Sequence, residues 1–183
     1  MRVYGFVTSV GYQFFNTDTL EHSNQLDKRD FHDEHDIHFI RGTEPKRKNI
    51  GDIALIDGSS SPVFSEKAKS VFPDAGRYIK LTNLEDFELF DAPVLDVLDY
   101  EKSEFDYFDD EKTEIMSIDK YAFKEELLLN IEAFRLKDFW SYPTFLTEKF
   151  VEKYKANNLT GIEFHCVYDS ENPENVGKFI QEM

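Results

Sequence analysis

Histidines gather near the start of the chain, and their spacing is the feature that best suits metal chemistry. After His22, the residues His32, His35 and His38 recur at intervals of three, so a helix would place their imidazoles on one face, as a zinc site could use. The apolar residues at 37–40 instead predict a strand, which would turn His38 away. A polar surface loop is therefore the preferred interpretation. We expect no metal and no cofactor, and His32, His35 and His38 stay weak candidates for metal ligands.

Nucleophilic catalysis has no recognisable motif in this sequence. The serines at 59–61 lack the Gly-x-Ser-x-Gly elbow, and no Gly-rich phosphate-binding loop follows Gly58. The single cysteine, Cys166, adjoins His165, but neighbouring residues of a strand point to opposite faces and cannot form a catalytic pair. The sequence therefore predicts a protein that is not an enzyme.

Carboxylates are densest at residues 96–114, where nine of them stand against two lysines, with aromatic residues interleaved. One interpretation is a docking surface, in which the rings anchor a basic partner and the carboxylates steer it. The other is a solvated acidic loop whose rings pack inward. A calcium loop is disfavoured because its central glycine is missing. The candidate partner-binding residues are Asp99, Glu101, Glu104, Phe105, Asp106, Tyr107, Asp109, Asp110 and Glu111.

The overall composition limits the class of partner. The chain has 183 residues, 40% of them hydrophobic, and 37 acidic against 21 basic residues give a net charge of −16. Such a surface repels nucleic acid and anionic lipid, and the small basic cluster of Arg41 and residues 46–48 does not offset it. No segment has the length and hydrophobicity of a signal sequence or a membrane span, and a lone cysteine fits a reducing compartment. We expect an acidic cytoplasmic protein.

A short sequence motif occurs twice in the chain, and each copy is followed by a helix and a strand. We call it the repeated phrase. Residues 62–67 (Pro-Val-Phe-Ser-Glu-Lys) return as 143–149 (Pro-Thr-Phe-Leu-Thr-Glu-Lys), and each copy leads into a helix capped by Ser65 or Thr147. A glycine and an apolar strand follow each helix. We expect an α+β fold, a mainly antiparallel sheet with a few short helices and an internal pseudo-repeat. Residues 1–58 would form a strand-rich lobe and 59–183 an α+β lobe, unless the two make one continuous domain.

The order of five phrases resembles the immunity proteins of bacterial polymorphic toxin systems. They are a Ser-Glu helix start at 62–66, a Leu-Asp phrase followed by Lys-Ser at 97–103, Phe-Arg-Leu at 133–136, a Thr-Glu helix start at 145–148 and Gly-x-x-Phe at 159–164. The resemblance covers about residues 60–168, and the phrases look structural, so they do not mark the binding face.

This resemblance implies a non-catalytic protein that binds and occludes the catalytic domain of a cognate toxin. A basic toxin would suit the acidic stretch. Two alternatives stay open, an acidic interaction module or adaptor with a basic cellular partner and a metal-dependent enzyme that uses the cluster from His22 to His38. The aromatic residues would also suit a homodimer.

Overall fold

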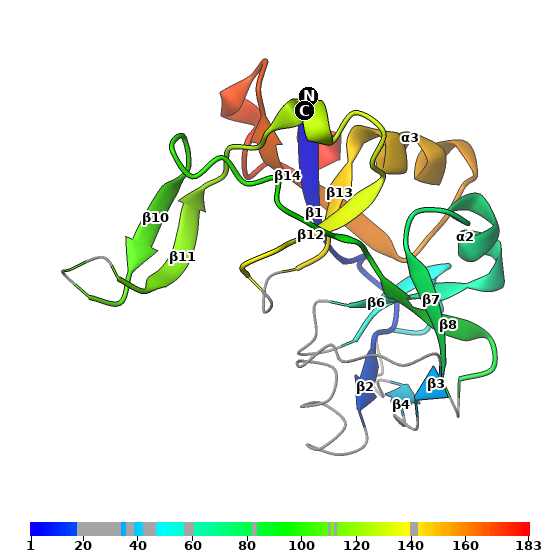
Figure 1. Cartoon of the computed structure of the whole chain (residues 1–183). Coiled ribbons are helices and arrows are strands. Elements are labelled where there is room, and N and C mark those ends of the chain that lie inside the picture. The colour runs from blue at the N-terminus through cyan, green and yellow to red at the C-terminus, as the bar shows by residue number, and fades with distance from the viewer. Residues whose placement is uncertain are drawn as a thin grey trace.

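The structure is a computed structural model that describes residues 1–17, 34–35, 39–41, 47–56, 61–81, 84–109, 111, 113–139 and 143–183 (Figure 1). Strands dominate these residues, and most of their pairings are antiparallel. The helices are short. The longest helix in the described chain has nine residues, well below the ~20 that span a membrane. The predicted α+β class with a mainly antiparallel sheet is confirmed.

One five-stranded sheet joins the two ends of the chain. It consists of β1 (Arg2–Thr8), β9 (Val94–Leu95), β12 (Ala133–Leu136), β13 (Phe145–Thr147) and β14 (Ile162–Asp169). The order is β14-β1-β13-β12-β9, antiparallel except for the β12–β9 pair. Strand β1 therefore lies between two strands that follow it by more than 130 residues in the sequence.

The second five-stranded sheet is built from the middle of the chain. It contains β3 (Glu34–His35), β5 (Ile53–Leu55), β6 (Pro62–Ser65), β7 (Arg77–Leu81) and β8 (Phe87–Asp91). The order is β3-β7-β8-β6-β5, and only β3 and β7 run parallel. The alternating burial of β7 and the buried run in β6 place its apolar residues against the core.

Smaller elements complete the described chain. Strands β2 (Phe15–Thr17) and β4 (Phe39–Arg41) form a two-stranded sheet. Three single 3-10 turns follow later, η1 (Glu125–Leu127), η2 (Pro173–Asn175) and η3 (Ile180–Glu182). The last two lie in the tail that packs beside β14.

The repeated phrase has the same place in both sheets. The order β5-β6-β8-β7 in one sheet matches β12-β13-β1-β14 in the other, and each copy of the phrase forms β6 or β13. A helix follows each of these strands, α2 (Glu66–Val71) or α3 (Glu148–Ala156). The second unit takes its third strand, β1, from the start of the chain. Strand β1, which belongs to residues 1–58, thus lies in a sheet whose other strands belong to residues 59–183. The division into two lobes at residue 58 stays a prediction.

The two helix starts differ in how they are capped. The Ser65 hydroxyl accepts a hydrogen bond from the Ala68 amide at 3.2 Å, as the sequence predicted. The side chain of Thr147 occupies the corresponding position but caps nothing. Its hydroxyl instead donates to the Ile131 carbonyl at 2.7 Å. Thr147 is therefore the N-cap residue that the sequence predicted, but its side chain makes no capping hydrogen bond because this buried hydroxyl ties β13 to the loop before β12.

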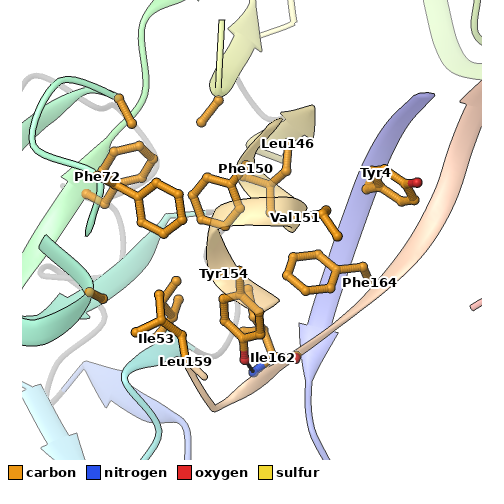
Figure 2. Close-up of a cluster of buried hydrophobic side chains, with 14 of the residues drawn as sticks. Tyr4, Ile53, Phe72, Leu146, Phe150, Val151, Tyr154, Leu159, Ile162 and Phe164 are labelled. Atoms are coloured by element: carbon orange, nitrogen blue, oxygen red, sulfur yellow. Dashed lines mark hydrogen bonds between the residues drawn. The ribbon is translucent and has the colours of Figure 1, made fainter. Parts of the chain in front are cut away.

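The main core lies where the two repeated units meet. Phe72 at the end of α2 and Phe150 in α3 are fully buried, and their rings stack with centroids 3.9 Å apart (Figure 2). Phe64 of β6 packs against both rings. Beside them, Gly161 has a φ of +114° and lies against the backbone of β5, a position where a Cβ atom would collide with the Ile53 carbonyl. The two units are thus held by contacts between residues far apart in sequence.

Candidate partner-binding arm

A β-hairpin stands away from the rest of the molecule in the middle of the chain (Figure 1). Its strands are β10 (Glu104–Tyr107) and β11 (Ile115–Lys120), which pair antiparallel as a two-stranded sheet. We call residues 99–120 the arm. The arm carries nine carboxylates and three lysines, a net charge of −6 on 22 residues of a chain whose total is −16. It contains all nine candidate partner-binding residues.

Two irregularities in the strand pairing give the arm an apolar and a polar face. Phe105 pairs with Ile118 and Tyr107 with Ile115, while Glu104 and Asp106 pair with residues of β11 on the opposite face. The register shifts between Asp106 and Tyr107, where Ser117 and Ile115 are the successive partners on β11, so Ile115 and Ile118 share a face although they are three residues apart. No residue of β11 was among the nine candidates, because the acidic stretch that marked the surface ends at residue 114.

Aromatic rings continue from the body of the protein along the apolar face. Phe139 lies 6.4 Å from Tyr100, Tyr100 lies 5.6 Å from Phe105, and Phe105 lies 6.3 Å from Tyr107, measured between ring centroids. The Tyr100 hydroxyl donates to Asp138 at 3.1 Å, and burial followed by this hydrogen bond raises the pKa of Tyr100 to about 12. This row fixes the base of the arm to the body, because Phe105 and Phe139 pack against a buried apolar cluster that contains Val97, Leu98 and Ile118.

Asp99 is used to build the base of the arm. Its carboxylate accepts hydrogen bonds from the amides of Glu101 and Lys102 at 3.2 and 3.3 Å, and it pairs with the Lys102 ammonium at 2.8 Å. The Lys102 side chain is the main cause that lowers the pKa of Asp99. The Asp99 amide donates to the Ala122 carbonyl, and the Ser103 amide donates to the Asp99 carbonyl, both at 2.9 Å. Asp99 is therefore a turn residue.

Asp109 stabilises the turn at the tip of the arm, as Asp99 does at the base. Its carboxylate accepts a hydrogen bond from the Thr113 amide at 2.9 Å and another from the Thr113 hydroxyl. Beside it, the Phe108 amide donates to the Glu114 carbonyl at 3.0 Å and closes the tip. Side-chain capping of this kind is typical of aspartate in tight turns.

The remaining candidate carboxylates differ in the hydrogen bonds and ion pairs that they make within the protein. Glu104 pairs across the strands with Lys120 at 2.8 Å, and Asp106 accepts a hydrogen bond from the amide of Tyr107. The exposed carboxylates of Glu101 and Glu111 make no hydrogen bond or ion pair with other described residues. Asp110 lies outside the described residues. Nothing in the sequence distinguishes these carboxylates. In the structure, Asp99 and Asp109 stabilise turns, whereas Glu101 and Glu111 lie in solvent.

Exposed apolar side chains concentrate on the arm and next to it. Among the described large hydrophobic residues that are exposed, six of eleven lie within residues 94–129. Phe108 at the tip is 66% exposed and Met116 on β11 is 46% exposed. The others in this region are Val94, Tyr100, Leu127 and Leu129. Uncovered apolar surface gathered in one region is typical of an interaction site.

The histidine hypothesis falls largely on residues that are not described. His22, His32 and His38 lie outside the described residues, and of His35 only its place in β3 is described. No group of three or more potential metal ligands occurs within the described ranges. The metal hypothesis for His32, His35 and His38 therefore stays untested.

His165 and Cys166 do not form a reactive pair. Cys166 is buried in the main core, and burial raises the pKa of its thiol. The imidazole of His165 lies against Gly5 and the ring of Phe179, and burial lowers its pKa. Its Nδ1 atom has no hydrogen-bond partner within the described chain. Both residues behave as parts of the packing between β14 and its neighbours.

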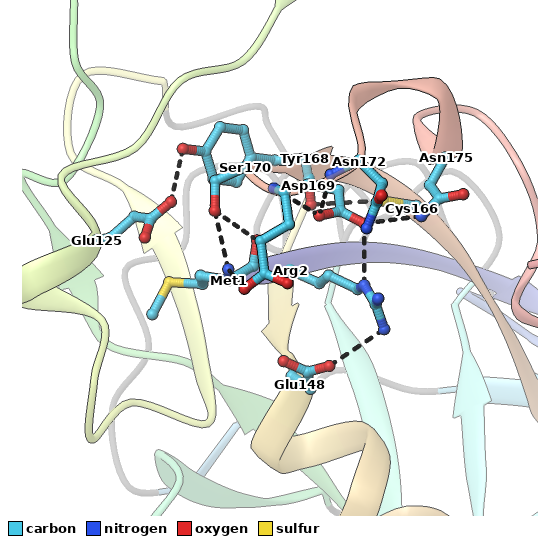
Figure 3. Close-up of polar contacts among 11 residues, drawn as sticks. Met1, Arg2, Glu125, Glu148, Cys166, Tyr168, Asp169, Ser170, Asn172 and Asn175 are labelled. Atoms are coloured by element: carbon cyan, nitrogen blue, oxygen red, sulfur yellow. Dashed lines mark hydrogen bonds and ion pairs between the residues drawn. The ribbon is translucent and has the colours of Figure 1, made fainter.

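A polar network ties the two ends of the chain to the sheet (Figure 3). The buried carboxylate of Asp169 accepts a hydrogen bond from Arg2 Nε at 2.9 Å, and Arg2 also pairs with Glu148 at 3.3 Å. The Tyr168 hydroxyl donates to Glu125, and the terminal amine donates to the Ser170 hydroxyl. The network stabilises the arrangement in which β1 completes the sheet.

The fold and the arm together define a small α+β protein with a protruding acidic hairpin, an arrangement suited to protein binding. Residues 92–169 match the model of the immunity protein family Imm11. This segment runs from just before β9 to the end of β14 and includes the whole arm. The resemblance to an immunity protein family is thus confirmed, over a shorter segment than the phrases from residue 60 onward suggested. A search of curated proteins finds no match.

Proposed function

We propose that this protein is an immunity protein that binds the catalytic domain of a cognate bacterial toxin and blocks it without catalysing a reaction itself. The observation that carries the proposal is the match of residues 92–169 to an immunity protein family. Such a protein would act in the cytoplasm of the cell that makes the toxin. It would need neither a metal nor a cofactor, since occlusion requires only a complementary surface.

The arm is the proposed contact surface. Its separation from the body leaves both strands accessible to a large partner, and its charge of −6 favours a toxin with a basic cleft. The family match supports this choice because it contains the arm in full. Nucleic acid and anionic membranes do not fit the same charge.

A protection assay with the adjacent toxin gene tests the proposal. The gene next to this one should encode a large protein whose C-terminal domain stops growth when expressed alone. Co-expression of this protein should restore growth, and the two proteins should elute together as a complex. A matched control is the co-expression of a destabilised variant such as Phe150→Ala, which should protect less in proportion to its loss of folded protein.

If co-expression does not restore growth, two other functions can be told apart by experiment. If growth is not restored and the proteins elute separately, the toxin proposal is wrong. A stable complex with a basic housekeeping protein would then support an interaction module. Stoichiometric zinc or manganese that is lost on substitution of His32 and His35 would support a metal-dependent enzyme.

A further inference from the structure

We infer that the apolar side chains in the outer half of the arm anchor the partner, and that the carboxylates of the arm mainly speed the encounter with a basic protein. These side chains are the exposed Phe108 and Met116 together with the half-buried pair of Tyr107 and Ile115. The inference rests on the proposed function and names the chemistry of the contact, an apolar recess with a basic rim on the toxin domain.

The two halves of the arm differ in how far their apolar side chains are covered. At the base, Ile118 is only 7% exposed, and Phe105 stacks on Tyr100. Further out, Phe108 is 66% exposed and Met116 is 46% exposed. The base is thus packed against the body of the protein, whereas the outer half reaches beyond it.

A two-stranded hairpin lacks a second layer that would bury its apolar face. Isolated hairpins of two strands are marginally stable in water, and natural sheets gain stability when a further layer covers one face. The rows of Phe105 with Ile118 and Tyr107 with Ile115 supply such a face. A partner that covered the outer half of the arm would provide the missing layer and bury Phe108 and Met116, whose exposed apolar side chains are costly to leave in water.

A second copy of this chain is the less suitable occupant. Two arms brought face to face would each contribute a charge of −6, and like charges repel when they are desolvated together. A basic partner turns the same carboxylates into attraction. Charge complementarity therefore favours a basic toxin domain over self-association.

The carboxylates are placed for steering more than for anchoring. Asp99 and Asp109 hold turns of the arm, and Glu104 is paired with Lys120. The exposed Glu101, Asp106 and Glu111 remain in solvent, where ion pairs contribute little to affinity but raise the association rate. Truncation of buried aromatic or apolar anchors instead raises the dissociation rate.

Binding kinetics of three double variants separate these roles. The probe is the C-terminal domain encoded by the adjacent gene, made with an inactivating substitution and immobilised on a sensor surface. The anchor variant is Phe108→Ser with Met116→Ser, and the charge variant is Asp106→Asn with Glu111→Gln. The control variant is Val176→Ser with Met183→Ser, two residues that are 49% and 42% exposed and lie in the C-terminal tail.

The anchor variant should dissociate about 30-fold faster or more, with an association rate within about threefold of the original. The charge variant should associate about tenfold more slowly at 50 mM salt and approach the original at 500 mM, with little change in dissociation. The control variant should behave like the original protein. All four proteins should share one circular dichroism spectrum, because the changed side chains are exposed.

The outcomes distinguish this inference from the proposed function. If the original protein binds the toxin domain and the anchor variant dissociates like the original, the anchor is elsewhere, although the immunity function stands. If the original protein does not bind, both proposals are wrong. If the free protein is a dimer that the anchor variant makes monomeric, with unchanged toxin binding, the face serves a second copy and the inference is overturned.

Discussion

Replacement of Asp169 by asparagine should destabilise the protein strongly at neutral pH. The Asp169 side chain is nearly inaccessible to solvent and accepts four hydrogen bonds, which the amide of asparagine cannot all match. The donors are Arg2 Nε at 2.9 Å, Asn175 Nδ2 at 2.8 Å and the amides of Glu171 and Asn172, both at 3.0 Å. The change would also leave the charge of Arg2 without its closest partner.

The pKa of Asp169 gives the size of the expected loss in folding free energy. Burial opposes ionisation of this carboxyl, but the hydrogen bonds from Asn175, Asn172, Arg2 and Glu171 outweigh burial and lower the pKa to about 2. Relative to the ordinary value of 3.8, this corresponds to about 2.5 kcal/mol of folding free energy. For a chain of this size, a loss of that order lowers Tm by about 5–10 °C.

The pH dependence follows from the sign of the shift. Because the folded pKa lies below the unfolded one, the contribution is fully present above about pH 4 and is lost as the pH falls through about 2. The difference in unfolding free energy between the original protein and Asp169→Asn should therefore shrink across this window.

Urea unfolding followed by circular dichroism at pH 7 and at pH 2.5 measures this difference. The matched control is Glu174→Gln, which removes an exposed carboxylate from the same tail and should change stability by less than about 0.5 kcal/mol. The reasoning is refuted if Asp169→Asn is as stable as the original protein at pH 7. It is also refuted if the difference is equally large at both pH values.

Three further predictions concern the folded state. Phe150→Ala should cost about 3–5 kcal/mol in urea unfolding because it empties the stack between the two units, whereas Leu129→Ala at an exposed position should be nearly neutral. Gly161→Ala should yield little folded protein on expression because its Cβ would collide with the backbone of β5. Gly177→Ala, also at positive φ but in open space, should lower the unfolding free energy by only about 1–2 kcal/mol. Burial lowers the pKa of His165, so stability should fall as the pH drops below about 6.5, and His165→Gln should remove this part of the slope in thermal unfolding.

Much of the local structure could be predicted from short stretches of sequence. The helix starts, the glycine before β14 and the alternation of apolar residues along β14 are local patterns, and each formed the expected element. Thr147 is the N-cap residue, but its side chain makes no capping hydrogen bond because a carbonyl near β12, sixteen residues away in sequence, competes for its hydroxyl. Local propensity does not include such tertiary partners.

The candidate surface could be predicted only in part. Composition identified an acidic, aromatic stretch at residues 96–114, and the arm contains all of it from Asp99 onward. The roles of its members depended on geometry, because Asp99 and Asp109 bind turn amides while Glu111 lies in solvent. Met116 was missed since a register shift, which leaves no clear sequence signal, decides what β11 exposes.

The sequence by itself determined the class of fold, the repeated phrase, the charge and the resemblance to an immunity protein family. These properties depend on residue types and on short spacings, which a single sequence contains in full. Tertiary structure alone decided that β1 completes the sheet of the second unit, that Phe72 meets Phe150, and that the arm leaves the body with Phe108 and Met116 exposed. The physical reason is that strand pairing and core packing join residues that are distant along the chain, and their free energy depends on the whole arrangement.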